Sequence, residues 1–324
     1  MATHPLPGFT AAPATIAAVV VRSEPVAASI RLIEISARDG RQLSPSAPGA
    51  HIGIILPDGT ERSYSLVRPD EAPAHYVIAV KLEAEGRGGS RYVHQLAAGD
   101  DIIITEPRNH FPLDEEAPVS VLIAGGIGIS PLWNMAQRLD ALGRDWVLHY
   151  ACRSRTDAAF HDTLAPLAGV HFHFDEDHDG RPLPIADIVA GLATDTHIYC
   201  CGPLPMLAAI EAAVAGRPAE RIHVEYFAPK EAAATNGGFI VKLGRSGGEV
   251  PVKPGQTVLK ALRNHGVEVP FSCEEGTCGA CEVRVLAGRP DHRDTVLTDE
   301  ERAESLTMMV CCSGSCTPTL TLDL

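Results

Sequence analysis

Apolar and polar residues alternate in six short runs over the first third of the chain. The runs are 16–22, 30–36, 51–56, 62–66, 76–82 and 101–105, and glycine, proline and aspartate separate them. A period of two is typical of strands that bury one face. Several short strands at this spacing predict a small antiparallel β-barrel over residues 1–113.

The pattern changes at about residue 114, where apolar runs begin to alternate with helical stretches. The apolar runs are 119–124, 146–151, 170–174, 197–201 and 222–226, and the clearest helical stretches are 131–142 and 205–215. Strands that alternate with helices are typical of a doubly wound parallel sheet. We therefore predict an α/β domain over residues 114–228.

An alanine-rich stretch that ends in Asn-Gly-Gly follows, and it predicts a linker at 229–237. Beyond it the pattern predicts strands at 239–243 and 249–252, a helix at 257–265, a cysteine-rich loop and closing strands. The chain is therefore expected to be multidomain, with a third domain over residues 238–324.

The cysteine-rich loop carries Cys273, Cys278 and Cys281, and Cys311 follows after a long gap. This is the spacing of the ligands of a plant-type 2Fe-2S cluster, which carries one electron at a time. Gly276 lies between the ligands, where a loop that wraps around inorganic sulfide needs unusual dihedral angles.

A zinc site or buried free thiols are the alternative interpretations of these cysteines. Zinc sites usually have two matching cysteine pairs, and this loop has no second pair, so the spacing favours the cluster. The gap selects Cys311 as the fourth ligand. Cys312 would point the opposite way in an extended segment, and Cys316 lies beyond Gly314 in a predicted turn.

Two glycine-containing turns follow strands of the α/β segment. The first, Gly125 to Pro131, leads into a helix with Ser130 as the expected N-cap and Pro131 at the first helical position. Such a turn can hold a pyrophosphate, although it departs from Gly-x-Gly-x-x-Gly and could be merely structural. The second, Cys201-Gly-Pro203, would lie at the same edge of the sheet. Cys201 would then lie beside a nicotinamide, or it is an ordinary buried thiol.

Two segments of the predicted barrel could bind an anion. Arg62 to Leu66 offers a guanidinium, an aromatic ring and a hydroxyl, and Gly86-Arg-Gly-Gly-Ser90 offers unhindered amides beside another guanidinium. Each segment alone would more often be an ordinary hairpin edge. Their presence upstream of a nucleotide-binding and an iron–sulfur segment gives them weight.

These motifs, together with Glu225-Tyr-Phe227, occur in the order found in phthalate dioxygenase reductase, and the chain resembles the vanillate O-demethylase reductase subunits still more closely. The resemblance covers essentially the whole chain. It implies an FMN-binding barrel, an NAD-binding domain and a C-terminal ferredoxin domain of the α+β, β-grasp class. Because related FAD-binding reductases have a different phosphate segment, Gly86–Ser90 favours FMN. The chain departs from the family at Ser313–Cys316.

The resemblance also implies the cofactor-binding residues. Those for FMN are Arg62, Tyr64, Ser65, Leu66, Lys81, Arg87, Gly88, Gly89 and Ser90. Those for the nicotinamide nucleotide are Gly126, Ser130, Arg153, Cys201, Gly202, Pro203 and Met206, with Phe227 over the flavin.

The three cofactors are chemically complementary. NADH gives up two electrons as a hydride, a 2Fe-2S cluster accepts one at a time, and a flavin can convert between the two. Hydride transfer from nicotinamide to flavin needs no general acid or base. The residues that could align the rings or stabilise charge are Ser65, Cys201, Glu225 and Phe227. His94, His110, His171 and His173 are interpreted as surface or core residues.

We therefore expect the chain to be the reductase component of a two-component Rieske-type oxygenase. Such a reductase is a metal-binding flavoprotein that passes electrons from NADH to the oxygenase. The alternatives are an NAD(P)H flavin diaphorase, an electron donor to a haem protein, and a non-catalytic iron–sulfur or zinc protein. NADH is expected over NADPH, although Arg153 and Arg155 could bind a 2′-phosphate. The organic substrate of the oxygenase does not follow from a reductase sequence.

Charge and composition narrow the choice of partners and of cellular compartment. Lys+Arg 27 against Asp+Glu 41 gives a net charge of −14, which argues against nucleic acid or an anionic membrane as a partner. The first residues, with Pro5, Pro7 and Pro13, have no basic region typical of a signal peptide. Cysteines in a cluster motif rather than a disulfide framework favour the cytoplasm. The acidic run 299–304 is interpreted as a solvated helix face rather than a docking site.

Overall fold

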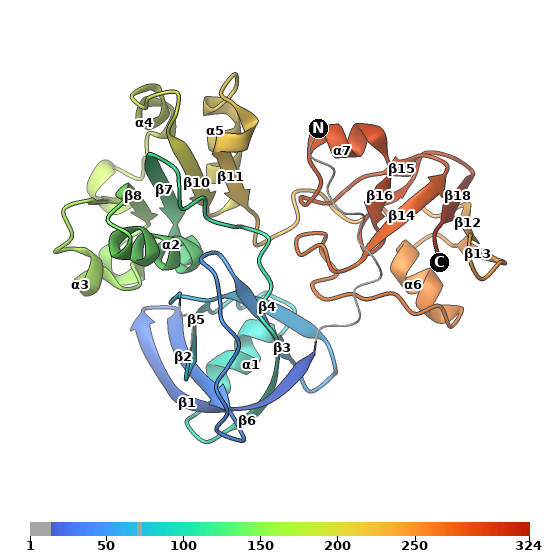
Figure 1. The fold of residues 1–324 in the computed structure, drawn as a ribbon, viewed down its shortest axis with the longest axis horizontal. Coiled ribbons are helices and arrows are strands. Elements are labelled where there is room, and N and C mark those ends of the chain that lie inside the picture. The colour runs from blue at the N-terminus through green and yellow to red at the C-terminus, as the bar shows by residue number, and fades with distance from the viewer. Residues whose placement is uncertain (1–13, 70–72) are drawn as a thin grey trace. The chain divides into compact units, whose positions relative to one another are not determined.

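The computed structural model describes residues 14–69 and 73–324, so the prolines at positions 5, 7 and 13 lie outside the described residues. Contacts within the chain divide it after Phe227 into two compact units. One unit runs from Thr15 to Phe227, and the other contains Ala228–Leu324 (Figure 1).

Six antiparallel strands form the first sheet of the larger unit. They are β1 (Thr15–Ala27), β2 (Ile30–Ala37), β3 (His51–Ile55), β4 (Glu61–Ser65), β5 (Tyr76–Lys81) and β6 (Asp101–Thr105), in the order β4-β3-β6-β1-β2-β5. An isolated bridge between Leu66, directly after β4, and Ile78 of β5 joins the two outermost strands. All six predicted strands are confirmed. β1 is longer than expected and contains two register shifts.

The strands β2 and β5 bury both faces. Ile33 and Ile78 pack in the apolar cluster formed by the strands of the first sheet. Leu32 and Val77 pack instead in a cluster with the helix α2 (Ile129–Ala141). This double burial explains why β5 is almost continuously apolar, whereas β2 also carries Arg31, Glu34 and Ser36 at partly exposed positions. It also packs the first sheet against the helix α2 of the α/β segment that follows.

The second sheet has five parallel strands, as the sequence predicts. They are β7 (Val119–Gly125), β8 (Asp145–Cys152), β9 (Val170–Phe174), β10 (His197–Cys201) and β11 (Ile222–Glu225), in the order β11-β10-β7-β8-β9. Alternate residues of β7 enter different clusters: Leu122 packs with α2, and Ile123 packs on the opposite face with α4 (Ile185–Ala190) and α5 (Leu204–Ala213). A short helix, α3 (His161–Leu164), follows β8.

One local expectation in this unit is wrong. The helix α2 begins at Ile129 after a 3₁₀ turn over Gly126–Gly128, so Ser130 lies inside its first turn and is not the N-cap. The Ser130 hydroxyl instead donates to the Ile127 carbonyl, at 3.0 Å. The helix α1 (Gly89–Gln95) begins within the glycine-rich segment 86–90.

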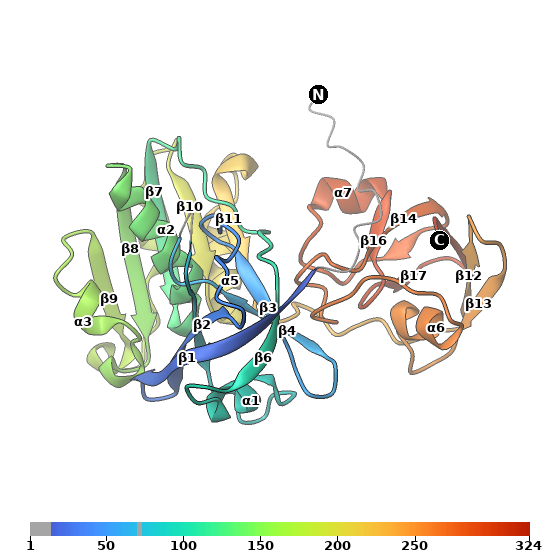
Figure 2. The same ribbon diagram turned by 60° about the horizontal axis from the view of Figure 1, so that its bottom comes forward.

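The smaller unit is built on a third sheet. Its strands are β12 (Phe239–Leu243), β13 (Glu249–Val252), β14 (Glu282–Ala287), β16 (Thr307–Met309) and β18 (Thr319–Leu322), in the order β13-β12-β18-β14-β16. Only β12 and β18 pair in parallel. The short strands β15 (Pro290–Asp291) and β17 (Gly314–Ser315) pair separately. Figure 2 shows the helices α6 (Val258–Asn264) and α7 (Asp299–Glu304) beside this sheet.

Within the described parts of the chain, no helix combines the length and apolar character needed to cross a membrane.

Candidate electron-transfer sites

The four cysteines selected by their spacing come together in the smaller unit. Cys273, Cys278 and Cys281 lie on the loop between α6 and β14, and Cys311 lies in the turn after β16. All four side chains are buried. The thiol of Cys273 interacts with those of Cys278 and Cys311, and Cys311 also interacts with Cys281. A set of four buried thiols suits a thiolate-bound metal cluster.

Left-handed backbone conformations shape the loop around these thiols. Gly276 has φ 72° and Gly279 has φ 70°, which glycine adopts without strain, and Glu274 has φ 56°. The resulting turn directs the Glu275 amide toward the Cys273 sulfur, at 3.3 Å. Amides that point at sulfur favour thiolates and the charge of a bound cluster, so the loop fits the expected group.

Cys312 lies beside Cys311, with which its thiol interacts, but not in the conformation that was expected. Cys312 is in a turn rather than an extended segment, and its sulfur lies 3.7 Å from the Met309 carbonyl oxygen. A Cβ on Gly276 would come within 2.4 Å of that sulfur, so Cys312 packs behind the loop. Cys316 is exposed and directly follows the strand β17.

The two glycine-containing turns of the α/β segment meet at one edge of the second sheet. β7 and β10 are neighbours although β8 and β9 separate them in sequence, and ligands bind at such a switch point beyond the strand carboxyl ends. A Cβ on Gly128 would lie 2.0 Å from the Cys201 carbonyl oxygen, and one on Gly202 would lie 2.6 Å from the Met206 sulfur. The two turns are therefore packed directly against each other.

The remaining predicted nucleotide-binding residues lie around these turns. Gly126 adopts φ 53°, and a Cβ there would meet nothing within 4 Å, so its surroundings are open. Arg153 follows β8 and is exposed, as is Pro203 after β10. Ser130 is buried, and its hydroxyl is already used by the helix. The open space at this glycine turn thus lets a ligand approach the backbone closely.

Cys201 and Glu225 occupy neighbouring positions on the paired strands β10 and β11. Cys201 is fully buried in the apolar cluster, which agrees with the alternative interpretation of an ordinary buried thiol. Burial raises the pKa of Glu225 to about 8, although its hydrogen bond with Cys201 opposes this shift. Glu225 is therefore mostly protonated at neutral pH, and it places a neutral polar group beside the switch point.

In the first sheet, Arg62 and Tyr64 of β4 lie against the start of α1. A Cβ on Gly89 would lie 2.6 Å from the Arg62 Cγ and 3.2 Å from the Tyr64 hydroxyl, so only glycine allows this close approach. Burial raises the pKa of Tyr64 to about 12, which keeps its hydroxyl protonated. A guanidinium, a hydroxyl and helix amides together suit a phosphate group.

The other predicted flavin-binding residues lie nearby in the fold, at strand ends and in the turn before α1. Ser65 and Leu66 are buried at the end of β4, and Arg87 is exposed in the glycine-rich turn. The Lys81 ammonium lies 2.7 Å from the Glu83 carboxylate. The Glu83 amide in turn donates to the Ser90 hydroxyl, at 3.0 Å. The sequence analysis missed Glu83, which links two of the predicted residues and carries no motif of its own.

Carboxylates surround Arg155, one of the two arginines expected near a 2′-phosphate. Its guanidinium lies 2.7 Å from the Asp177 carboxylate and 4.7 Å from the centre of the Phe174 ring. Its amide donates to the Glu176 carboxylate, at 2.9 Å. Because carboxylates already engage this arginine, the site suits a ribose hydroxyl better than a 2′-phosphate.

Phe227 ends the larger unit, and 40% of the residue is exposed. Among the histidines, His94 binds the Val80 carbonyl at 2.8 Å, His173 binds the Arg181 carbonyl at 2.9 Å, and His171 stacks on His149. These contacts are structural, as predicted.

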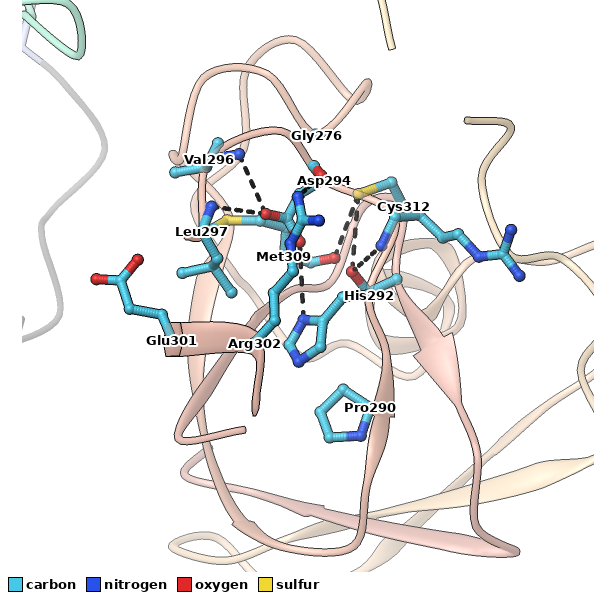
Figure 3. A network of polar contacts seen from close by, with 12 residues as sticks. Gly276, Pro290, His292, Asp294, Val296, Leu297, Glu301, Arg302, Met309 and Cys312 are labelled. Atoms are coloured by element: carbon cyan, nitrogen blue, oxygen red, sulfur yellow. Dashed lines mark hydrogen bonds and ion pairs between the residues drawn. The ribbon is translucent and has the colours of Figure 1, made fainter. Parts of the chain in front are cut away.

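A buried polar network lies behind the loop 273–281, which is called the cluster-binding loop below. Sequence analysis did not identify this network. Figure 3 shows Asp294, His292 and Arg302 grouped beside Gly276 and Cys312. The Thr295 amide donates to the Gly276 carbonyl, at 2.9 Å, and so ties this segment to the loop. No motif marks these residues, because their chemistry depends on burial rather than on spacing.

Family comparisons agree with the arrangement of these sites. Residues 241–316 match the family described as a 2Fe-2S iron-sulfur cluster binding domain. Residues 122–212 match the oxidoreductase NAD-binding domain.

Three similar proteins match over nearly their whole lengths. Phenoxybenzoate dioxygenase subunit beta of Ectopseudomonas oleovorans is 55% identical over 89% of this chain and 90% of its own. Tetrachlorobenzoquinone reductase of Sphingobium chlorophenolicum is 46% identical, over 96% and 98%. Vanillate O-demethylase oxidoreductase of Pseudomonas sp. strain HR199 is 42% identical, over 92% and 96%.

Two solved structures are similar in fold and sequence. Phthalate dioxygenase reductase, described as a modular structure for electron transfer from pyridine nucleotides to a 2Fe-2S centre, has a TM-score of 0.73 and 34% identity, over 96% of this chain and 98% of its own. An intact type IV self-sufficient cytochrome P450 monooxygenase has a TM-score of 0.84 and 41% identity, over 96% of this chain and 41% of its own. The chain therefore belongs to the phthalate dioxygenase reductase family, the iron–sulfur flavoprotein oxidoreductases that use FMN, a nicotinamide nucleotide and a 2Fe-2S cluster.

Proposed function

We propose that the chain is the reductase component of a two-component Rieske-type oxygenase and passes electrons from NADH through FMN and a 2Fe-2S cluster to the oxygenase. The observation that carries this proposal is the meeting of four buried thiols from two separate segments of a chain that also has a nucleotide-type switch point. The similarity to a dioxygenase subunit and to vanillate O-demethylase oxidoreductase supports the kind of partner.

FMN would be held at the corner where β4 meets the start of α1. The Arg62 guanidinium, the Tyr64 hydroxyl and the amides after Gly88 would bind its phosphate, and Ser65 would lie nearer the ring. Leu66, Lys81, Arg87, Gly89 and Ser90 complete the proposed site. When bound, FMN supplies the conversion between a two-electron donor and a one-electron acceptor.

The nicotinamide nucleotide would bind at the switch point between β7 and β10. The turn at Gly126 would approach its pyrophosphate, and Cys201, Gly202 and Pro203 would line the nicotinamide end. Ser130, Arg153 and Met206 complete this site, with Phe227 as the ring that a nicotinamide displaces. The protonated Glu225 would place a neutral carboxyl group beside the nicotinamide.

Cys273, Cys278, Cys281 and Cys311 are the proposed ligands of the cluster. Their domain would span residues 238–324 as a β-grasp ferredoxin domain after a linker at 229–237. The NAD-binding domain would span 114–228 and the flavin domain 1–113. The Leu66–Ile78 bridge supports closure of the first sheet into a barrel.

Rapid mixing with NADH under anaerobic conditions tests the electron path. We expect loss of flavin absorption first and loss of cluster absorption second, and then reoxidation when a purified Rieske oxygenase is added. Failure of NADH to reduce an intact, flavin-loaded cluster would contradict the proposed path. Reduction without any transfer to Rieske oxygenases would contradict only the proposed partner.

A haem protein is the second candidate partner, because a self-sufficient cytochrome P450 monooxygenase is 41% identical to this chain over 41% of its own length. The same reduced protein can be mixed with a cytochrome P450 that lacks its own reductase. Electron transfer faster to the haem protein than to a Rieske oxygenase would favour this candidate.

A further inference from the structure

Asp294 is a buried carboxylate behind the cluster-binding loop. It lies in the segment between β15 and α7, and 3% of the residue is exposed. Its Oδ2 accepts hydrogen bonds from the amides of Leu297, at 2.8 Å, and Val296, at 3.1 Å, as Figure 3 shows. The side chain therefore holds the turn that leads into α7.

Two cationic or ionisable groups approach Asp294 from either side. His292 Nδ1 lies 3.7 Å from the Asp294 Oδ1, with a side chain only 9% exposed. The Arg302 guanidinium of α7 donates to the Asp294 backbone carbonyl. Arg302 also lies near the exposed Asp299, at 3.7 Å, so only part of its charge is available to Asp294.

Four buried polar atoms in this network have no hydrogen-bond partner among the described residues. They are both ring nitrogens of His292, Oδ1 of Asp294 and Nε of Arg302. Two of them, His292 Nδ1 and Asp294 Oδ1, face each other at 3.7 Å, within reach of an ion pair but too far for a hydrogen bond. Orphaned polar atoms are rare in folded proteins, and a group of them calls for a reason beyond stability. Burial would raise the pKa of Asp294, but His292, the two amides and Arg302 together hold it below its usual value. The carboxylate is thus ionised.

The network is joined directly to the loop between two proposed ligands. The amide of Thr295, the next residue, donates to the Gly276 carbonyl at 2.9 Å. A Cβ on Gly276 would lie 3.0 Å from the Asp294 Cα, so the two backbones are in contact. Gly276 lies between Cys273 and Cys278, and any movement of the Asp294 turn is passed to the cluster-binding loop.

We infer that Asp294 is a positioning residue for the cluster, which clamps the ligand loop through Thr295 and lowers the reduction potential through its buried negative charge. Adding an electron makes the cluster more negative, and a nearby carboxylate in a low-dielectric setting opposes that. A lower potential makes the reduced cluster a stronger donor to its partner. This inference rests on the proposed cluster ligands.

The substitution Asp294→Asn tests the charge separately from the clamp. The asparagine side chain keeps an oxygen for the two amides and loses the charge, whether or not His292 is protonated in the wild type. We expect an unchanged iron content. We also expect the equilibrium constant for cluster reduction to be about tenfold higher, which corresponds to a rise of about 59 mV in the reduction potential of a one-electron couple. A spectroelectrochemical titration of the full chain measures this shift.

Asp294→Ala tests the clamp, because alanine leaves both amides without an acceptor. We expect iron loss to a chelator several-fold faster than in the wild type. Thr298→Ala is the matched control, since it removes another hydrogen-bonding cap from the same segment, at the start of α7. It should change neither the potential nor the rate of iron loss.

An intact cluster with an unchanged potential in Asp294→Asn would overturn the electrostatic role. Equal iron loss in Asp294→Ala and Thr298→Ala would overturn the clamp. A wild-type protein that binds no cluster at all would instead overturn the proposed function, together with this inference.

Discussion

Cys311 and Cys312 are adjacent in sequence, but their surroundings differ. Cys311 interacts with Cys273 and Cys281 as well as with Cys312, whereas Cys312 also lies against the Met309 carbonyl and the back of the loop. A turn after β16, rather than the alternation of a strand, separates the two thiols.

Replacing Cys311 by serine should therefore remove most of the visible cluster absorption and of the bound iron. Cys316→Ser, at an exposed thiol, is the control and should retain both. Iron analysis and the absorption spectrum of the purified proteins measure the outcome. A Cys311→Ser protein with a normal cluster would mean that another cysteine supplies the fourth ligand.

Glu225 is expected to make stability depend on pH. Its pKa in the folded protein is about 8 because it is buried, against an ordinary value of 4.5. A raised carboxyl pKa contributes stability that is fully present below about pH 4.5 and is lost as the pH rises through 8. We expect the thermal midpoint of the wild type to fall over this range more than that of Glu225→Gln. Each 1 kcal/mol corresponds to about 2–4 °C in a domain of this size. Parallel pH profiles for the two proteins would refute this assignment.

At the scale of elements, the packing of the two turns leaves no room for a side chain at Gly128. Its Cβ would meet the Cys201 backbone, which cannot rotate away. Gly128→Ala should therefore destabilise the protein by about 1–3 kcal/mol, as overpacking does. Gly191→Ala is the control, because Gly191 has φ −81° and its nearest atom lies at 3.5 Å. Urea denaturation of both variants measures their free energies of unfolding. An equal loss of unfolding free energy in the two variants would contradict the packing argument.

The 3₁₀ turn after β9 carries the acidic group that engages Arg155. Asp177→Asn weakens this ion pair and leaves Arg155 freer to meet a 2′-phosphate. We expect kcat/KM for NADPH to rise about fivefold relative to NADH, since an exposed charge pair is worth ~1 kcal/mol. Asp179→Asn removes a neighbouring charge that pairs with Arg181 instead, and should leave the ratio unchanged. Equal ratios in both variants would place the 2′ position elsewhere.

At the scale of the whole molecule, the net charge of −14 should govern encounters with electron acceptors. The exposed helix α7 adds to this field, and its structure agrees with the expected solvated face. Turnover with the basic protein cytochrome c should fall several-fold between low and high salt, because salt screens attraction. Turnover with ferricyanide, an anion, should rise or stay constant. The same salt dependence for both acceptors would exclude electrostatic steering.

The sequence by itself determined the strands, the order of the three sheets and the four cysteines to be tested as ligands. These properties follow from patterns of period two, from strand–helix alternation and from fixed spacing, which depend on residues close in the chain. Even so, the place of Ser130 was mispredicted, because the 3₁₀ turn at Gly126 shifts the helix start.

Only the tertiary structure decided which partner each side chain meets. Arg155 has the same sequence signal whether it faces solvent or Asp177, and Asp294 has the signal of a surface residue although it is buried. Such partners come from segments brought together by folding, and burial then sets the pKa of Glu225 and the charge behind the cluster-binding loop. A pattern along the chain records neither, because both depend on the loss of solvent and on contacts between distant residues.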